Sequence, residues 1–521
     1  MATSQESHRR VGTLAGVFVH PRPARPVPRR LADLAALLGL APPPGAGATQ
    51  VTGVTLDSRT VQPGDLYAAL PGATVHGARF VPQAVRAGAV AVLTDPVGEP
   101  SAAAAGAPVL VVDDPRGRLG EIAVEIYGTA YAVTGLQILG ITGTNGKTTV
   151  AYFLEAGLTA AGLVSGLIGT VETRIAAAAV PSTRTTPEAP DLQALLAVMA
   201  ERDVQAVAME VSSHALAQHR VDGMRFTVGA FTNLSQDHLD YHGDLESYFH
   251  AKALLFDGRC DHEVVNVDDA YGRRLVGPAT ITVSTEGRPG AHWRAADIAA
   301  GTGGGSTFSV IGPGGDLFTA GVRLPGRFNV ANALIAFAVL AAAGVDPARA
   351  AAAIAETTVP GRLESVAAGQ PFTALVDYAH TPDAVSTLLA ALRPTVTGLL
   401  IVVLGCGGDR DQGKRELMGA AAARGADVLV VTDDNPRSED PAAIRAAMMR
   451  GAEDVPTDVR ARVLEAPDRR EAIAVAVSLA GPADTVVVAG KGHEQGQEAG
   501  GALRPFDDRL VLAEQIGSLV P

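Results

Sequence analysis

The chain has 521 residues, which at about 150 residues per domain corresponds to three or four domains. Apolar residues make up 47% and charged residues 19%, so the composition predicts folded domains and excludes a wholly disordered chain. The formal net charge is −13, and a uniformly acidic surface repels nucleic acid and anionic membranes. We therefore expect neither as a partner, and any anionic ligand requires a local basic pocket.

The sequence also argues against export and membrane insertion. Its longest apolar run, over residues 333–345, is shorter than the roughly 20 residues that span a bilayer. The polar, Arg/Pro-rich N-terminus has no signal-peptide pattern. Cys260 and Cys406 are too few for a disulfide framework or a four-cysteine zinc site, which suits a reducing compartment. We expect a cytoplasmic protein.

Lysine is rare in this chain. The 42 basic residues include four lysines, namely Lys147, Lys252, Lys414 and Lys491. A lysine retained in a chain that otherwise uses arginine indicates a need for a compact ammonium group or a reactive amine. Chance can explain any one of them, but all four lie beside glycine, histidine or acidic clusters, which favours functional roles.

The pattern of composition divides the chain into four segments. Residues 1–30 carry six arginines and a run of prolines, which predicts a mobile arm. Residues 31–134 predict an α/β domain, with strands over 51–56, 89–93 and 109–112. Residues 135–360 predict a second α/β domain with a mainly parallel sheet, and residues 361–521 a third, doubly wound domain.

The second domain opens with a strand over 136–141, a glycine turn and a helix over 147–161. Further strands are expected over 206–211, 227–231 and 263–267, a hairpin or loop over 301–315 and a helix over 329–343. The third domain has strands over 374–376, 399–404, 428–432 and 485–489, apolar on both faces as buried parallel strands are. Polar residues follow each of these strands, at the edge where α/β sheets bind ligands.

The glycine turn is the sharpest local signal. A glycine-rich turn between a strand and a helix lets backbone N–H groups approach a phosphate, and the helix N-terminus adds its dipole. Lys147 would reach the outer phosphates and Thr148 would offer a hydroxyl to Mg²⁺. Ile141 stands where the usual GxxxxGK[ST] pattern has its first glycine, and the alternative is a glycine turn with an incidental lysine. The candidate phosphate-binding residues are Gly143, Thr144, Asn145, Gly146, Lys147, Thr148 and Thr149.

Two polar residues near strand ends are candidates for a metal site. Glu210 ends one apolar strand and His238 lies in a polar segment, 233–242, that follows another; oxygen and imidazole ligands suit Mg²⁺. The alternative for each alone is a satisfied polar residue. Lys252 follows in an apolar helical stretch, where an ordinary surface lysine is the more common interpretation. The second interpretation is a reactive amine that takes up CO₂ as a carbamate, which would convert the lysine into a metal ligand.

Taken together, these motifs resemble the Mur ligase family, the ATP-dependent amino-acid-adding enzymes of peptidoglycan precursor synthesis. The resemblance extends from about residue 51 to the C-terminus, includes the family's own form of the phosphate loop, and leaves the N-terminal arm without a match. It implies a central P-loop ATPase domain and a Rossmann-like C-terminal domain. The motifs that carry it are residues 143–149, 210–214, 233–242, Lys252, 327–332 and 377–382.

The resemblance also implies roles for individual residues. It makes Glu210 and His238 metal ligands beside Thr148, and Lys252 a carbamylated lysine. The nucleotide would contact Asn329, Asn332, Asp377, Tyr378 and His380, although Asn329 has the alternative of a helix N-cap. The uridine nucleotide and the muramoyl dipeptide would contact Leu56, Ser58, Thr185, Thr186, Ser212, Gln218 and Arg220.

The tetrapeptide 434–437 is associated, within the family, with meso-diaminopimelate as the added amino acid. The distal end of this amino acid is zwitterionic, so an arginine and acidic residues are the appropriate partners; Arg437 can bind a carboxylate bidentately. The alternative is an internal arginine–carboxylate pair. The residues that resemble this site are Arg410, Asp434, Asn435, Pro436, Arg437, Gly490 and Glu494.

The implied reaction uses ATP and Mg²⁺ to phosphorylate the γ-carboxylate of D-Glu in UDP-MurNAc-L-Ala-D-Glu. The amine of meso-diaminopimelate then displaces phosphate, and we expect the enzyme to act as a monomer. The chemistry needs no nucleophilic side chain, and we expect Cys406 to be a small buried residue. Two alternatives stay open: a folylpolyglutamate synthetase, which shares the acyl-phosphate chemistry, and a nucleotide-binding regulator without activity.

Overall fold

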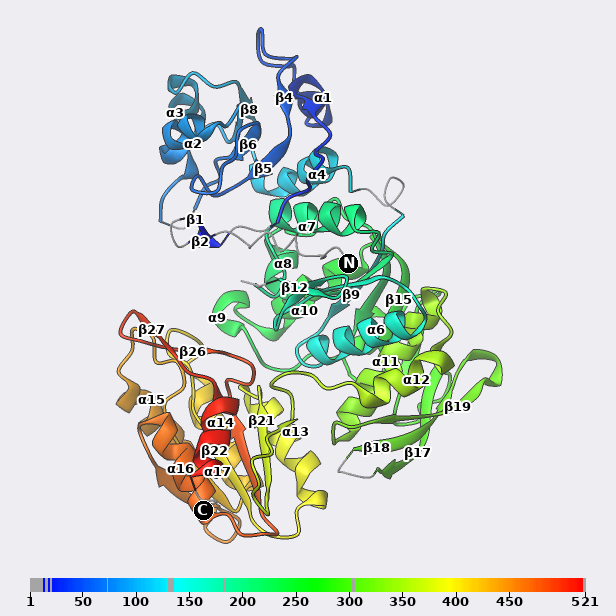
Figure 1. Cartoon of the computed structure of the whole chain (residues 1–521), viewed down its shortest axis with the longest axis vertical. Helices are drawn as coiled ribbons and strands as arrows, with labels where there is room; N and C mark the ends of the chain where they lie inside the picture. The colour runs from blue at the N-terminus through cyan, green and yellow to red at the C-terminus, as the bar shows by residue number, and fades with distance from the viewer. Residues whose placement is uncertain are drawn as a thin grey trace, which may run out of the picture. The chain divides into compact units, whose positions relative to one another are not determined.

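A computed structural model describes residues 21–72, 74–129, 135–180, 184–301 and 305–518, with the backbone of two short strands, β1 (Thr13–Leu14) and β2 (Val17–Phe18). Figure 1 shows the elements in chain order. The chain forms two compact units: Met1–Thr142, Ala161–Ala230 and Ala251–Glu263 make the first, and Gly143–Ala160, Phe231–His250 and Val264–Pro521 the second. None of the helices within the described ranges is long and apolar enough to cross a membrane.

The N-terminal part of the first unit is a four-stranded parallel sheet covered on both faces. Its strands, in spatial order, are β5 (Gly53–Thr55), β6 (Asp65–Ala68), β7 (Ala91–Thr94) and β8 (Val109–Val111). Leu66 and Leu93 pack with α1 (Leu31–Leu37) and α4 (Pro115–Tyr127). Tyr67 and Val92 point the other way, into a core with α2 (Val81–Ala87) and α3 (Glu99–Ala104). The predicted α/β pattern is confirmed, with β6 and the short helix η1 (Gly77–Phe80) as additions.

The prediction of a mobile arm over residues 1–30 is wrong for residues 21–30. Strand β3 (Arg29–Arg30) pairs with β4 (Gln50–Val51). The N–H groups of Ala24 and Arg25 donate to the two carboxylate oxygens of Glu201 at 2.8 and 2.9 Å. Arg22 forms an ion pair with the buried Asp65. Strand pairing and carboxylate partners therefore hold residues 21–30 in place. The rest of the predicted arm, residues 1–20, lies outside the described part of the chain apart from the backbone of β1 and β2.

An eleven-stranded sheet follows in the order β12-β11-β10-β13-β9-β14-β15-β16-β17-β18-β19. In the first unit, β9 (Gln137–Thr142), β13 (Ala206–Glu210) and β10 (Ser165–Ile168) are parallel, and β11 (Thr173–Ile175) and β12 (Ala178–Val180) are antiparallel additions. Helix α7 (Ala189–Glu201) packs Leu195 and Met199 into a core with Val207 and Met209. The remaining elements of this unit are α8 (Ser213–Ala217) and β14 (Phe226–Phe231), and η2 (Leu254–Phe256) follows later in the chain.

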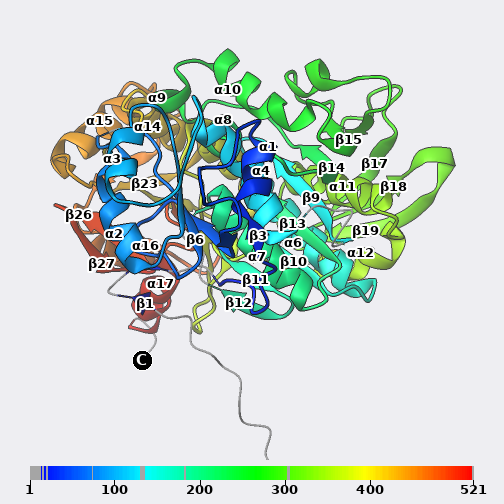
Figure 2. The same cartoon turned by 90° about the horizontal axis from the view of Figure 1, so that it is seen from above.

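In the second unit, β16 (Ile281–Ser284) lies parallel to both β15 (Cys260–Asn266) and β17 (Trp293–Ala300). Strands β18 (Ser306–Ile311) and β19 (Leu317–Val322) then form the hairpin predicted in the glycine-rich segment. Helices α11 (Arg327–Ala342) and α12 (Pro347–Glu356) lie beside these strands in Figure 1 and Figure 2. A Cβ on Gly157 of α6 (Lys147–Ala160) would collide with Leu340, so glycine permits the close packing of α6 on α11. The short helices here are α9 (Leu239–His242), α10 (Leu245–Ala253), η3 (Gly272–Leu275) and η5 (Pro313–Gly315).

The C-terminal part of the second unit is a doubly wound domain, as predicted. Its sheet runs β20 (Glu364–Ser365), β21 (Thr373–Asp377), β25 (Thr485–Ala489), β22 (Leu400–Leu404), β23 (Val428–Val431) and β24 (Arg462–Glu465), with β20 alone antiparallel. Val403 and Val488 pack with α16 (Arg469–Leu479) and α17 (Asp508–Gly517). The other elements are α13 (Pro382–Leu392), η6 (Arg393–Thr395), α14 (Lys414–Gly425), α15 (Pro441–Glu453) and the hairpin β26 (Gly496–Ala499) and β27 (Ala502–Pro505).

This topology places the polar segments predicted to bind ligands at one edge of the sheet. Strands β21, β22, β23 and β25 are parallel, so their carboxyl ends lie together. The chain order and the spatial order differ at β25, which lies between β21 and β22. Residues from four separate parts of the C-terminal sequence therefore meet above this edge.

Candidate active site

The glycine-rich loop before α6 is held by the segment that follows β14. The N–H of Thr144 donates to the carbonyl oxygen of Asn233 at 2.8 Å, and the N–H of Asn145 donates to Asn233 Oδ1 at 3.0 Å. Gly146 has a φ of +92°, and a Cβ there would collide with Asn332 Oδ1. The loop therefore depends on a glycine for both its backbone conformation and its close approach to α11.

Lys147 begins helix α6 and folds back over the loop. Its Nζ donates to the carbonyl oxygens of Gly143 at 2.9 Å and Thr144 at 2.8 Å. Thr148 and Thr149 follow in the first turn and are buried. The loop thus lies between strand β9 and helix α6, as expected for a phosphate-binding loop, and the lysine ammonium lies at the helix N-terminus.

The two asparagines that were predicted to contact the nucleotide are buried and hydrogen-bonded to each other. Asn329 Nδ2 donates to Pro325 O at 2.8 Å, and Asn332 Nδ2 donates to Asn329 Oδ1 at 3.2 Å. Gly326, rather than Asn329, is the N-cap of α11. The alternative role of Asn329 as a helix cap is therefore wrong; its amide instead ties the first turn of α11 to the preceding chain.

His238 lies next to an acidic residue that the sequence interpretation did not single out. Asp237 is almost fully buried, and its Oδ2 lies 3.4 Å from His238 Nε2 and 3.9 Å from His380 Nε2. Burial alone would raise the pKa of Asp237, but the charges of His380, His238 and two lysines, Lys414 and Lys147, hold it below its ordinary value. Burial and Lys414 lower the pKa of His380. At neutral pH, Asp237 is therefore an anion that lies between two imidazoles.

Arg362 is a second residue that the sequence interpretation missed. Its guanidinium lies 4.5 Å from the centre of the Tyr378 ring, and Nη2 lies 3.5 Å from Thr148 Oγ1. Asp377 accepts hydrogen bonds from the N–H groups of Leu363 and Ala379, both at 2.8 Å, and burial raises its pKa. Arg362 therefore brings the predicted nucleotide residues of β21 close to the first turn of α6.

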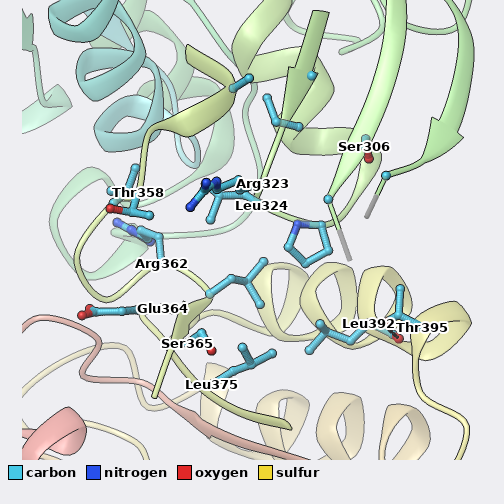
Figure 3. Close-up of a pocket in the computed structure, with 18 of the residues that line it drawn as sticks. Ser306, Arg323, Leu324, Thr358, Arg362, Glu364, Ser365, Leu375, Leu392 and Thr395 are labelled. Atoms are coloured by element: carbon cyan, nitrogen blue, oxygen red, sulfur yellow. Dashed lines mark hydrogen bonds between the residues drawn. The ribbon is translucent and has the colours of Figure 1, made fainter. Parts of the chain in front are cut away.

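Arg362 also lines a cavity of about 1140 Å³ in the second unit. Figure 3 shows Arg362, Thr358 and Arg323 close to one another, with Leu392 and Thr395 further along the cavity. The lining mixes charged, hydroxyl and aliphatic groups from the central and C-terminal parts of the unit. None of the sequence motifs includes a residue of this cavity, because its lining comes from strands, helices and connecting segments that are far apart in the sequence.

In the first unit, Glu210 is buried at the carboxyl end of β13, opposite Ile141 of β9. Its two carboxylate oxygens accept hydrogen bonds from the N–H of Thr170 at 2.8 Å and from Thr170 Oγ1 at 3.1 Å. The hydroxyls of Thr170 and Thr185 lie 2.9 Å apart. Glu210 is therefore a buried carboxylate at the end of β13, next to the end of β9, the strand that the glycine-rich loop follows in the sequence.

The other predicted dipeptide-binding residues gather beside Glu210. Ser212 N–H donates to Thr186 Oγ1 at 3.1 Å, and Thr186 Oγ1 donates to the carbonyl oxygen of Glu210 at 2.9 Å. Arg220 Nη1 donates to Thr186 O at 3.0 Å, and Arg220 Nη2 donates to Gln218 Oε1 at 2.6 Å. Five residues between positions 186 and 220 therefore form one hydrogen-bonded group around a strand end.

Lys252 is not a surface lysine. Its side chain is fully buried although it belongs to a short helix, α10. An ammonium that is removed from water requires compensating partners. The structure therefore removes the more common of the two interpretations of this residue.

The predicted uridine residues follow β5 at the carboxyl end of the N-terminal parallel sheet. Leu56 is half-buried against the core, and Ser58 is buried with its Oγ 3.4 Å from Gln83 Oε1. The adjacent Asp57 and Arg59 form an ion pair at 2.7 Å. This is the edge at which parallel α/β sheets bind ligands.

The C-terminal acceptor residues form one cluster. Asn435 Nδ2 donates to Glu494 Oε2 at 2.9 Å, and Lys491 Nζ donates to both Asn435 Oδ1 and Glu494 Oε2 at 3.0 Å. Gly490 packs closely against Asp434, since a Cβ at Gly490 would lie 2.7 Å from Asp434 Oδ2. The sequence interpretation included four of these residues and missed Lys491, although the rarity of lysine had marked it.

Arg437 is partly paired within the protein. Its Nη1 donates to Gly408 O at 2.6 Å and its Nε lies 3.3 Å from Glu498 Oε2, so the internal-pair alternative holds for one side of the guanidinium. Within the described ranges, Nη2 makes no hydrogen bond. Pro436 is buried, whereas Arg410 is exposed on the neighbouring loop. Cys406 is buried as expected, where burial raises the pKa of its thiol.

Comparison with known proteins identifies the class. Three family models match: "Mur ligase family, catalytic domain" over residues 50–127, "Mur ligase middle domain" over residues 141–340, and "Mur ligase, glutamate ligase domain" over residues 361–492. Together they cover most of the chain, in the order of its four-stranded, eleven-stranded and six-stranded sheets. The chain belongs to the Mur ligase family.

Individual relatives are similar over nearly their whole length. The UDP-N-acetylmuramoyl-L-alanyl-D-glutamate–2,6-diaminopimelate ligase of Streptomyces avermitilis is 58% identical over 95% of this chain and 98% of its own. The protein of that name from Corynebacterium glutamicum is 46% identical over 92% and 95%. A solved structure of a ligase of that name is 33% identical, covers 95% of this chain and 99% of its own, and has a TM-score of 0.66.

Proposed function

We propose that the chain is the ATP-dependent ligase that joins meso-diaminopimelate to the γ-carboxylate of D-Glu in UDP-MurNAc-L-Ala-D-Glu. Membership of the Mur ligase family and relatives whose names state this reaction support the proposal. They also disfavour the folylpolyglutamate synthetase and inactive-regulator alternatives. We place the enzyme in the cytoplasm, where ATP and nucleotide-linked precursors are found, and expect it to act as a monomer.

The observation that carries the choice of acceptor is an unused pair of opposite charges beside β23. Asp434 is buried, yet its carboxylate accepts no hydrogen bond within the described residues. Arg437 keeps Nη2 free of described partners while its Nη1 and Nε are anchored. A carboxylate and a guanidinium edge, each left without a hydrogen bond and three residues apart in one segment, suit a ligand group that carries both an ammonium and a carboxylate.

The nucleotide would bind at the glycine-rich loop. Backbone N–H groups at the start of α6 and the ammonium of Lys147 suit the β- and γ-phosphates of ATP. Arg362 lies near Thr148 in the same helix turn, and Lys414 lies near Asp237. Both would add positive charge where the phosphoryl group is transferred. We expect Asn329, Asn332, Asp377, Tyr378 and His380 to line the remainder of the nucleotide site.

The donors present fit Mg²⁺ better than a metal that requires a protein cage. Within the described residues, no three His, Cys, Asp or Glu side chains gather as a metal cluster. Mg²⁺ usually keeps several waters and binds through one or two carboxylates and the substrate phosphates. We propose Thr148, Glu210, His238 and carbamylated Lys252 as the residues that hold it. When bound, Mg²⁺ would neutralise charge on the phosphates.

The proposed reaction has two steps, a phosphoryl transfer and an acyl transfer. An oxygen of the D-Glu γ-carboxylate attacks the γ-phosphorus of ATP, the bond to ADP breaks, and an acyl phosphate forms. The amine of the amino acid attacks the acyl carbon, loses a proton and expels phosphate. The protein supplies position and charge: Thr185, Thr186, Ser212, Gln218 and Arg220 hold the dipeptide, Leu56 and Ser58 the uridine nucleotide, and Lys147 the phosphoryl oxygens.

The test is release of phosphate from ATP in the presence of Mg²⁺ and UDP-MurNAc-L-Ala-D-Glu, with meso-diaminopimelate compared with L-lysine. We expect turnover that depends on diaminopimelate and is weak with L-lysine. Turnover with L-lysine alone would keep the ligase but contradict the role given to Arg437. ATP binding with no turnover on either amino acid would favour the regulator.

A further inference from the structure

We propose that Lys491 is a positioning residue that holds Glu494 and Asn435 and sets the charge balance of the acceptor site. The inference rests on the proposed function, because it concerns how that site selects an amino acid with a zwitterionic end. Lys491 lies directly after Gly490, in the loop that follows β25. Its side chain is completely buried, and no ligand-binding role was predicted for it.

The geometry shows why the ammonium belongs to the protein rather than to a ligand. Lys491 Nζ donates to Asn435 Oδ1 and to Glu494 Oε2, both at 3.0 Å. Asn435 Oδ1 also accepts from the N–H of Glu498 at 3.0 Å, so this amide is fixed from two sides. A fully buried ammonium persists only where such partners compensate for the lost water. Lys491 therefore locks the tetrapeptide after β23 to the loop after β25.

The same contacts decide which charges are left for a substrate. Glu494 Oε2 receives two hydrogen bonds, from Lys491 and Asn435, whereas the carboxylate remains about one-third exposed. Glu498 lies beside Arg437. Lys491 thus neutralises Glu494, which leaves Asp434 as the unpaired anion of the cluster. One anion without a hydrogen bond and one open guanidinium edge in the same segment match the ammonium and the carboxylate of the proposed acceptor.

Without Lys491 the balance would change. The cluster would keep the carboxylates of Asp434, Glu494 and Glu498, while Arg437, which pairs with Glu498, and the buried Arg469, which pairs with Asp508, would be the cations left near them. The excess negative charge would repel the distal carboxylate of the acceptor and favour an acceptor with an ammonium alone. Glu494 and Asn435 would also lose the contact that orients them. Lys491 therefore acts on affinity and selectivity for the acceptor, through Glu494, and does not touch the reacting atoms.

The experiment uses the full-length enzyme with four variants: K491M, E494Q, the double variant, and R504M as a control. R504M also removes one positive charge, from an exposed position on β27. For K491M we expect the KM for diaminopimelate to rise at least about tenfold. The KM values for ATP and UDP-MurNAc-L-Ala-D-Glu should stay within twofold of wild type, and the ratio of kcat/KM for diaminopimelate over L-lysine should fall. R504M should change none of these values.

A double-mutant cycle tests whether the effect runs through Glu494. If Lys491 acts by positioning and neutralising Glu494, the double variant should have the KM of E494Q alone. Additive effects, or a KM for diaminopimelate within twofold of wild type in K491M, would overturn the proposal. Hydroxylamine trapping of the acyl phosphate without acceptor should be unchanged in K491M, which separates a local effect from loss of folding. Wild-type enzyme without diaminopimelate-dependent turnover would overturn the proposed function itself.

Discussion

Arg469 and Asp508 form an ion pair in which both side chains are completely buried. The guanidinium donates to Asp508 Oδ1 at 2.8 Å and to Oδ2 at 2.7 Å. Its Nη2 also donates to Ala489 O at 2.9 Å, and its Nη1 lies 3.5 Å from Asp433 O. One arginine thus connects α16 and α17 to the ends of β23 and β25, immediately before Asp434 and Gly490.

Arg469→Met should lower the free energy of unfolding of the C-terminal domain by about 3–5 kcal/mol, because it leaves the Asp508 carboxylate buried without a partner. Urea unfolding measures this effect. The double variant Arg469→Met/Asp508→Leu should recover much of the loss, since neither charge then remains buried. An equal loss in the single and double variants would contradict the explanation by an unpaired charge.

Gly146→Ala should reduce phosphate release about 100-fold, because the added Cβ collides with Asn332 Oδ1 and displaces the phosphate loop. Gly162→Ala is the matched control. Gly162 has a φ of +84°, close to the +92° of Gly146, but nothing lies within 4 Å of its Cβ position. Both variants carry the backbone strain of a left-handed alanine, roughly 1–2 kcal/mol, so a comparable loss of activity in both would show that strain rather than collision is responsible.

Arg437→Lys should raise the KM for diaminopimelate by roughly 10–100-fold, because an ammonium cannot hold Gly408 O and Glu498 while presenting a second edge to a carboxylate. The KM for ATP should not change, since Arg437 lies in the acceptor cluster. Steady-state kinetics with each substrate varied in turn provides the measurement. An unchanged KM for diaminopimelate would return Arg437 to a purely internal pairing role.

Lys252→Ala should lose activity by roughly 10–100-fold or more, and short carboxylates added to the assay should restore part of it. In the proposed modification the neutral amine attacks CO₂, a nitrogen–carbon bond forms and a proton leaves, which yields a carboxylate-like ligand. Mass spectrometry of the intact protein under CO₂ provides a second readout. Normal activity in the variant would end the carbamate proposal.

Asp191, in the first turn of α7, predicts a pH effect on stability. Burial raises its pKa to about 6, partly opposed by Arg22. The folded state therefore binds the proton more tightly than the unfolded state, so this group's stabilising contribution is present below pH 4 and is lost as pH rises toward 6. Asp191→Asn should stabilise the protein by up to about 3 kcal/mol at pH 7.5 and have little effect near pH 4. Unfolding at the two pH values measures the difference, and equal effects at both would refute it.

Much of the secondary structure was predictable because it depends on local patterns. Apolar runs such as 400–404 and 485–489 form buried parallel strands, and the glycine turn before Lys147 lies between a strand and a helix as expected. The short strands β10–β12 and β24 were not predicted. Their few residues carry little periodicity, and pairing with neighbours distant in sequence determines their conformation. The same reason explains residues 21–30, whose partners Asp65 and Glu201 are remote in sequence.

The amino-acid sequence was enough to predict which kinds of chemical group this protein offers: a phosphate loop, a tetrapeptide that ends in Arg437, and four lysines in an arginine-rich chain. Which of these groups are already paired depends on the folded chain. Lys491 neutralises Glu494, Arg437 keeps one edge open, and Asp434 remains without a described partner. The physical reason is that residue identity fixes charge and hydrogen-bonding capacity, whereas burial and pairing depend on segments that meet only when the sheet is assembled.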